Sequence, residues 1–169
     1  MTTRTLFEDL YRHMEWADAT VWAVVLASEA ARADAVTLGG LQHIHMVQRA
    51  FLSVWREEPI DGHAGENLEP RFLATWAETY YALSRARIRE ATEEALGAPV
   101  RIPWAKRVIE RLGFEPGPTS FAETIVQVYS HTAHHRGQVI SRLRRLGATP
   151  PLIDYIAWVW QGRPSPPWP

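Results

Sequence analysis

Residues 120–147 form the stretch that most constrains the fold, because both ends of a helix can be read from it. Ser120 and Glu123 have the spacing of a capping box, in which each side chain satisfies a free backbone N–H group. Gly147 and the two prolines that soon follow it mark the stop, since proline cannot continue a helix. No proline lies between these signals, so the stretch predicts a helix of about seven turns.

Two histidines of this helix, His131 and His135, are four residues apart and therefore lie on one face. The spacing allows both imidazoles to bind one metal ion at about 2.0–2.1 Å each. They continue a row on the apolar side of the helix, whereas His134 continues a row on its polar side. We expect His131 and His135 as ligands, with the pair His131 and His134 as the weaker alternative. Because such pairs also occur by chance, the hypothesis needs a third histidine elsewhere.

The rest of the chain predicts further helices from apolar residues that recur every three or four positions. An irregular or short hairpin excursion is expected between the third and fourth long helices, where prolines and glycines gather and apolar residues alternate. Within it, Val108 and Ile109 fit a short strand or a helical turn equally well. We expect an all-α fold, a four-helix bundle formed by a single domain over residues 1–169 and completed by a short C-terminal helix. The predicted helices include residues 3–30, 69–96, 120–147 and 152–162. A further helix is expected to begin between Ala35 and Leu41 and to end at about residue 56. A loop is expected over 57–68, and the excursion over 98–118.

The first helix carries charged residues that we expect to face water, namely Arg12, Glu15 and Asp18. His13 falls beside its apolar stripe, and we expect a partly buried, hydrogen-bonded residue rather than a ligand. His63 lies in the polar loop after the second helix, where histidines are usually exposed, so it is not expected to bind metal either.

The second helix offers the third histidine. His43 stands in a row with Val47, Ala50, Phe51 and Val54, so we expect it to face inward. His45 shares a more polar row and is left open as the alternative ligand. Metal sites in bundles lie in the core, between facing helices. Three neutral imidazoles leave a coordination position open, which is typical of catalytic zinc, although imidazole also suits nickel, iron and copper.

Composition excludes several other functions. The chain has no cysteine, which rules out disulfides and thiolate ligands. Its net charge of −1 gives no electrostatic argument for a nucleic-acid partner. No apolar run is long enough to span a bilayer, and no signal pattern is evident at the N-terminus, so we expect a cytoplasmic protein without a membrane partner.

The sequence resembles the DinB-like (DinB/YfiT) four-helix bundles over nearly its whole length. The resemblance is carried by residues 11–17, by 41–44 and by the motif His131-x-x-x-His135-Arg136-Gly137-Gln138, with support from 150–160. It implies a bundle that is often dimeric, so a homodimer is expected. It also implies a divalent metal, zinc or nickel, held by residues that correspond here to His43, His131 and His135. Related enzymes transfer groups with low-molecular-weight thiols such as bacillithiol, mycothiol or glutathione.

Two residues of the motif are expected beside the metal. Gln138 lies one turn from His135 and can orient a ligand or a substrate. Arg136 either holds a carboxylate of a bound molecule or pairs with an acid on another helix. We expect a metal-dependent enzyme, a thiol transferase or a hydrolase that acts on a small molecule. The alternative is a non-catalytic metal-binding module of a stress response, with His45 or His134 as a fourth ligand.

Overall fold

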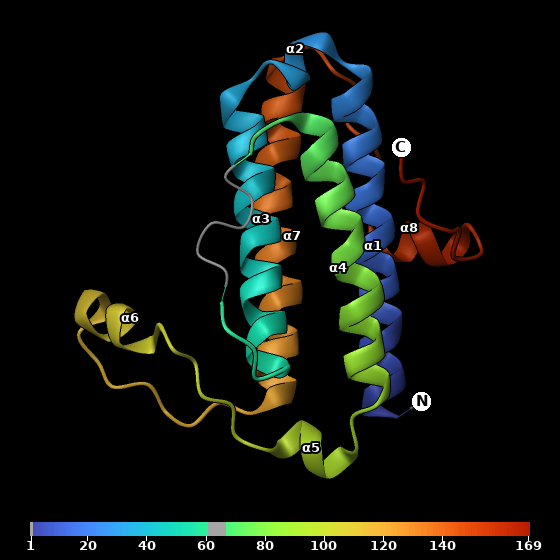
Figure 1. The fold of residues 1–169 in the computed structure, drawn as a ribbon. Coiled ribbons are helices and arrows are strands. Elements are labelled where there is room, and N and C mark those ends of the chain that lie inside the picture. Colours follow the sequence, from blue (N-terminus) through green and yellow to red (C-terminus); the bar gives the residue numbers. More distant parts are fainter. Residues whose placement is uncertain (1, 61–66) are drawn as a thin grey trace.

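Four long helices form a bundle in the computed structural model of the chain, which describes residues 2–60 and 67–169 (Figure 1). α1 and α7 run in one direction, and α3 and α4 run in the other. α3 packs mainly against α7, and α1 mainly against α4. The predicted all-α bundle is therefore confirmed. The long helices are α1 (Thr3–Ala27), α3 (Ala35–Trp55), α4 (Pro70–Arg89) and α7 (Phe121–Arg145).

Two of the predicted long helices are interrupted by a residue that starts a new helix. Ser28 follows α1 and is the N-cap of the next helix, α2 (Glu29–Arg32). Its hydroxyl accepts a hydrogen bond from the backbone N–H of Ala31. Thr92 caps α5 (Glu93–Gly97) in the same way through Ala95. Serine and threonine are good N-caps because their side chains satisfy free N–H groups, so each marks a boundary inside a predicted helix.

The excursion between the third and fourth long helices contains a helix, not a hairpin. No strand forms in the described part of the chain, and Pro99 and Ser120 make only an isolated bridge. The backbone N–H of Val100 donates to Thr119 at 2.7 Å, and this bond ties the two ends of the excursion together. Between these ends lies α6 (Ala105–Leu112), which stands beside α3 in Figure 1.

Both end signals of α7 act as predicted. The Ser120 hydroxyl accepts a bond from the N–H of Glu123, and the Glu123 carboxylate accepts one from the N–H of Ser120 at 2.6 Å. At the other end, Gly147 has a φ of 79°. Its left-handed conformation lets the N–H of Ala148 reach the carbonyl of Leu143 at 3.0 Å, as in a Schellman motif.

The C-terminal segment packs on the outer side of α1. α8 (Tyr155–Trp160) is the expected short helix, and its Tyr155 hydroxyl donates to Asp9 at 2.6 Å. The indole of Trp158 is buried against Trp16 and donates to the carbonyl of Pro164. None of the helices in the described ranges is both long and apolar enough to cross a membrane.

Candidate metal centre

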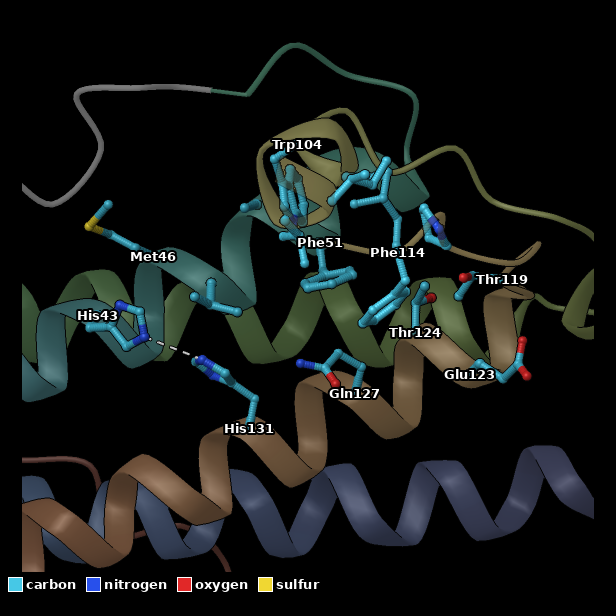
Figure 2. A pocket seen from close by; sticks show the side chains of 17 residues that line it. His43, Met46, Phe51, Trp104, Phe114, Thr119, Glu123, Thr124, Gln127 and His131 are labelled. Carbon is cyan, nitrogen blue, oxygen red and sulfur yellow. Dashed lines mark hydrogen bonds between the residues drawn. The ribbon is translucent and has the colours of Figure 1, made fainter. Parts of the chain in front are cut away.

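Three histidines meet where α3 packs on α7. His43 comes from α3, and His131 and His135 come from successive turns of α7. Each offers one ring nitrogen, and these three atoms lie within 4.8 Å of one another. The Nε2 atoms of His43 and His131 are 3.3 Å apart (Figure 2). Two ligand atoms that each lie about 2.0–2.1 Å from one tetrahedral ion are separated by roughly this 3.3 Å distance, so the donor set fits a metal.

A glycine allows the two helices to approach closely beside this cluster. Gly40 lies one turn before His43, and a Cβ atom added there would be only 3.0 Å from Cγ2 of Val139. Val139 itself lies one turn after His135 and is buried. The absence of a side chain at Gly40 therefore lets α3 bring His43 within reach of α7.

The surroundings of the cluster favour the neutral form of His43 and His131. Partial burial, and then the neighbouring His135, lower the pKa of His131 to about 4. Burial, followed again by His135, also lowers the pKa of His43. A neutral imidazole is the form that binds a metal, because protonation blocks the lone pair.

Gln138 fixes the orientation of one ring. The Nδ1 atom of His135 lies 2.9 Å from Oε1 of Gln138, which can only accept the hydrogen bond. The proton is thereby held on Nδ1, and Nε2 is left with a free lone pair. The side-chain nitrogen of Gln138 in turn contacts the exposed His134 at 3.0 Å. His134 is thus a neighbour of the cluster and not one of its three members.

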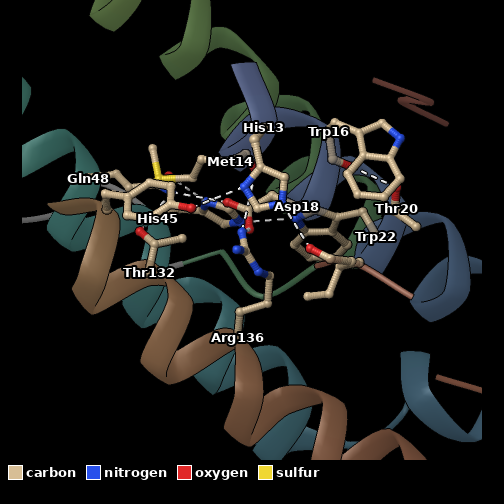
Figure 3. Close-up of polar contacts among 12 residues, drawn as sticks. His13, Met14, Trp16, Asp18, Thr20, Trp22, His45, Gln48, Thr132 and Arg136 are labelled. Atoms are coloured by element: carbon tan, nitrogen blue, oxygen red, sulfur yellow. Dashed lines mark hydrogen bonds and ion pairs between the residues drawn. The ribbon is translucent and has the colours of Figure 1, made fainter. Parts of the chain in front are cut away.

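His45 lies in the core behind the cluster, which reverses the expected directions of the two α3 histidines. Its ring is fully buried, with Nε2 accepting from the Trp22 indole at 3.0 Å and Nδ1 at 2.9 Å from Oε1 of Gln48 (Figure 3). His43 is the exposed one. Since both nitrogens of His45 are engaged, the structure brings His43, and not His45, into the cluster.

Arg136 forms the ion pair that was one of its two expected roles. Its guanidinium is 3% exposed and lies 2.7 Å from the carboxylate of Asp18, which is 1% exposed (Figure 3). The expectation that Asp18 and Glu15 face water was wrong, because each has a cationic partner inside the bundle: Glu15 pairs with Arg85 of α4. Arg136 is therefore directed to the core, and the expected contact with a bound molecule is replaced by this pair.

A pocket of about 760 Å³ begins at the cluster and extends toward the start of α7 (Figure 2). We call it the apolar pocket. His43 and His131 lie at one end, and Phe114, Thr124 and Glu123 lie toward the other. Its walls are α3, α7 and the excursion with α6. One wall is formed by four residues of the α3 row that we expected to face the core, namely His43, Val47, Ala50 and Phe51.

Comparison with known families places the chain. The sequence model of the DinB family matches residues 1–164 of 169. The chain belongs to the DinB family. No curated protein and no solved structure matches it in the corresponding searches. The resemblance seen in the sequence is thus confirmed, and the three histidines of this DinB-family protein can hold a divalent ion.

Sequence reasoning missed the polar network that supports the cluster of this DinB-family protein. The side-chain nitrogen of Gln48 lies 3.1 Å from Asp18, 3.1 Å from the hydroxyl of Tyr81 and 3.2 Å from that of Thr132. These partners belong to α1, α4 and α7, so the contacts join all four long helices next to His131. The available signal was two polar residues, His45 and Gln48, three positions apart among hydrophobic neighbours of α3.

The remaining histidines of the described part of the chain lie outside the three-histidine cluster. His13 is buried, with Nε2 donating to the carbonyl of Ile153 at 2.9 Å and Nδ1 3.2 Å from the Tyr129 hydroxyl. Its expected role as a hydrogen-bonded residue is confirmed. His63 lies outside the described residues.

Proposed function

We propose that this DinB-family protein is a metal-dependent enzyme that acts on a small molecule. Its divalent ion, zinc or nickel, would be held by His43, His131 and His135, and the reaction would be the transfer of a low-molecular-weight thiol or a hydrolysis. The observation that carries the proposal is the position of the cluster. Three imidazoles converge, and two of them, His43 and His131, line one end of a pocket large enough for a substrate.

The side chains around the cluster have separate roles in this proposal. When bound, a divalent ion lowers the pKa of a coordinated thiol or water and so supplies a nucleophile near neutral pH. Gln138 keeps the proton of His135 on Nδ1. The apolar walls of the pocket exclude water from the far part of the substrate and hold it in place.

The geometry favours an enzyme over a closed, non-catalytic metal site. A closed site needs a fourth protein ligand, for which His45 and His134 were the candidates. His45 is engaged on both nitrogens, and His134 contacts Gln138. Among the residues that the structure describes, no carboxylate or further histidine joins the three imidazoles.

The test combines metal content with turnover. We expect purified protein loaded with zinc or nickel to bind one ion per chain, and His131→Ala to lose it, while His134→Ala retains it. Thiol transfer to 1-chloro-2,4-dinitrobenzene and hydrolysis of p-nitrophenyl acetate should vanish on chelation and in His131→Ala. Full metal occupancy with four protein ligands by X-ray absorption, and no turnover with any thiol or ester, would identify the non-catalytic module instead.

A further inference from the structure

The charge of the apolar pocket restricts what it can bind. Among its described lining residues there is no lysine or arginine, and the only acid is Glu123. The Glu123 carboxylate accepts hydrogen bonds from the backbone and hydroxyl of Ser120, at the end of the pocket far from the histidines. An anionic ligand would therefore find no cationic partner along these walls. The lining residues are His43, Met46, Val47, Ala50, Phe51, Ile102, Trp104, Ala105, Val108, Ile109, Phe114, Pro116, Thr119, Glu123, Thr124, Gln127 and His131.

The side-chain amide of Gln127 gives the pocket a hydrogen-bonding group apart from its histidines. Thr124 accepts a bond from the Trp55 indole at 2.9 Å and donates to the carbonyl of Phe121 at 2.6 Å. The hydroxyl of Thr119 contacts the carbonyl of Gly117. The amide of Gln127 makes no side-chain hydrogen bond within the described ranges, and it lies between Thr124 and His131 in Figure 2.

Large apolar side chains of the pocket remain exposed. Phe114 is 59% exposed, Val108 is 44% exposed and Met46 is 41% exposed. They come from the excursion, from α6 and from α3, so they surround one concave space instead of being scattered over the surface. Exposed apolar groups gathered in this way mark a binding site for an apolar molecule.

We propose that the apolar pocket binds an uncharged, mainly apolar small molecule with an aromatic or alkyl body. The body lies against α3 and α6, a carbonyl or similar acceptor of the molecule bonds to the Gln127 amide, and the reacting group reaches the histidines; this last point rests on the proposed function. If the reaction uses an anionic thiol such as glutathione, the pocket holds the acceptor of the transfer and not the thiol.

Two dyes with one skeleton test the selection against charge. N-phenyl-1-naphthylamine is uncharged, and 8-anilinonaphthalene-1-sulfonate is the same molecule with a sulfonate. We expect the neutral dye to bind saturably with a Kd at least tenfold lower than that of the anionic dye. Val108→Asp places a charge in the pocket, and Ala50→Trp fills part of it. Each variant should lower the affinity for the neutral dye at least tenfold. Ala133→Trp, at an exposed position of α7 outside the pocket, should leave its binding unchanged.

A dye that carries a carbonyl tests Gln127. Prodan, an uncharged naphthyl ketone, should bind the wild type and lose at least threefold in affinity in Gln127→Leu. Equal binding of the neutral and anionic dyes, or neutral-dye binding that ignores both pocket variants, overturns the proposal. A third outcome also overturns the proposal: sedimentation velocity shows a dimer that binds no dye, and Val108→Asp dissociates it. A second copy of the chain would then occupy the pocket.

The dye measurements separate this inference from the proposed function. They need no bound metal. A protein that selects the neutral dye, but neither binds an ion nor turns over a substrate, would support the neutral-ligand pocket and contradict the proposed enzyme. A protein that binds an ion and turns over a thiol, but fails to distinguish the two dyes, would support the proposed enzyme and contradict the neutral-ligand pocket.

Discussion

The imidazole of His135 donates its Nδ1 proton to Oε1 of Gln138, which lies 2.9 Å away and one turn further along α7. This bond settles which nitrogen of His135 faces the cluster as an acceptor. Because both residues lie on one helix, the orientation is set by α7 alone and does not depend on the packing of α3.

Replacing Gln138 should weaken metal binding without abolishing it. In Gln138→Ala the His135 ring can rotate and change tautomer, so we expect the affinity for zinc to fall about 10–100-fold. Competition with a chromophoric chelator measures the effect. Gln138→Glu keeps an acceptor and should restore most of the affinity. Gln127→Ala, one turn before His131, is the matched control and should bind zinc as the wild type does; equal affinity in Gln138→Ala would show that the bond is not used.

The two faces of α3 show how far sequence can predict such a site. The row of His43, Val47, Ala50, Phe51 and Val54 is mostly apolar, and we expected it to face the core. All of these residues except Val54 line the apolar pocket, and of them only Phe51 is also buried in the core. The buried face includes His45. Periodicity finds apolar rows, but it cannot tell a bundle core from a pocket wall. His43 was therefore chosen as the candidate ligand for a reason that the structure does not bear out.

The buried charges show a second limit. The helix signals around α7 are local, so Ser120, Glu123 and Gly147 could be interpreted from neighbouring residues. The pair between Asp18 and Arg136 joins residues far apart in the sequence, and neither one signals the other. A charge on a helix is normally solvated, and only the three-dimensional partner makes its burial acceptable.

The Asp18–Arg136 pair should be far more sensitive to the loss of one member than to the loss of both. Asp18→Ala leaves a buried guanidinium without its partner, so we expect the free energy of unfolding to fall by about 3–5 kcal/mol. Asp18→Leu combined with Arg136→Met removes both charges and should lose less than Asp18→Ala. Urea unfolding followed by circular dichroism measures each change. Arg12→Met, at an exposed position of α1, is the control; a double variant less stable than Asp18→Ala would contradict the argument.

Two glycines in facing helices should respond to alanine with opposite signs. A Cβ atom at Gly137 meets no atom within 4 Å, so Gly137→Ala should gain the helix propensity of alanine and stabilise the protein by up to about 1 kcal/mol. A Cβ atom at Gly40 would press on Val139 at 3.0 Å. Overpacking of this kind costs about 1–3 kcal/mol, which exceeds the gain of up to about 1 kcal/mol in helix propensity, so Gly40→Ala should destabilise the protein. Urea unfolding of the pair checks both signs, and a stabilised Gly40→Ala would show that α3 and α7 are not in close contact at this point.

Asp34 connects the start of α3 to the end of α7. Its carboxylate accepts a bond from the N–H of Thr37 at 2.8 Å, and two bonds from the guanidinium of Arg142 at 3.0 and 2.6 Å. The bonds from Arg142, followed by those from Thr37, hold the pKa of Asp34 well below its usual range. The unfolded chain therefore takes up a proton at Asp34 at a higher pH than the folded chain does.

Stability that depends on Asp34 should be complete above the ordinary carboxyl pKa of about 3.9 and should be lost as the pH falls below it toward the lowered pKa. Asp34→Asn keeps a good N-cap and removes the charge together with one acceptor for Arg142. We expect its free energy of unfolding to fall less steeply than that of the wild type between pH 4 and pH 2.5, as measured by urea unfolding at each pH. Glu94→Gln removes one exposed carboxylate from α5 and should keep the wild-type slope. Parallel slopes for the wild type and Asp34→Asn would mean that the bond between Asp34 and Arg142 does not stabilise the folded chain.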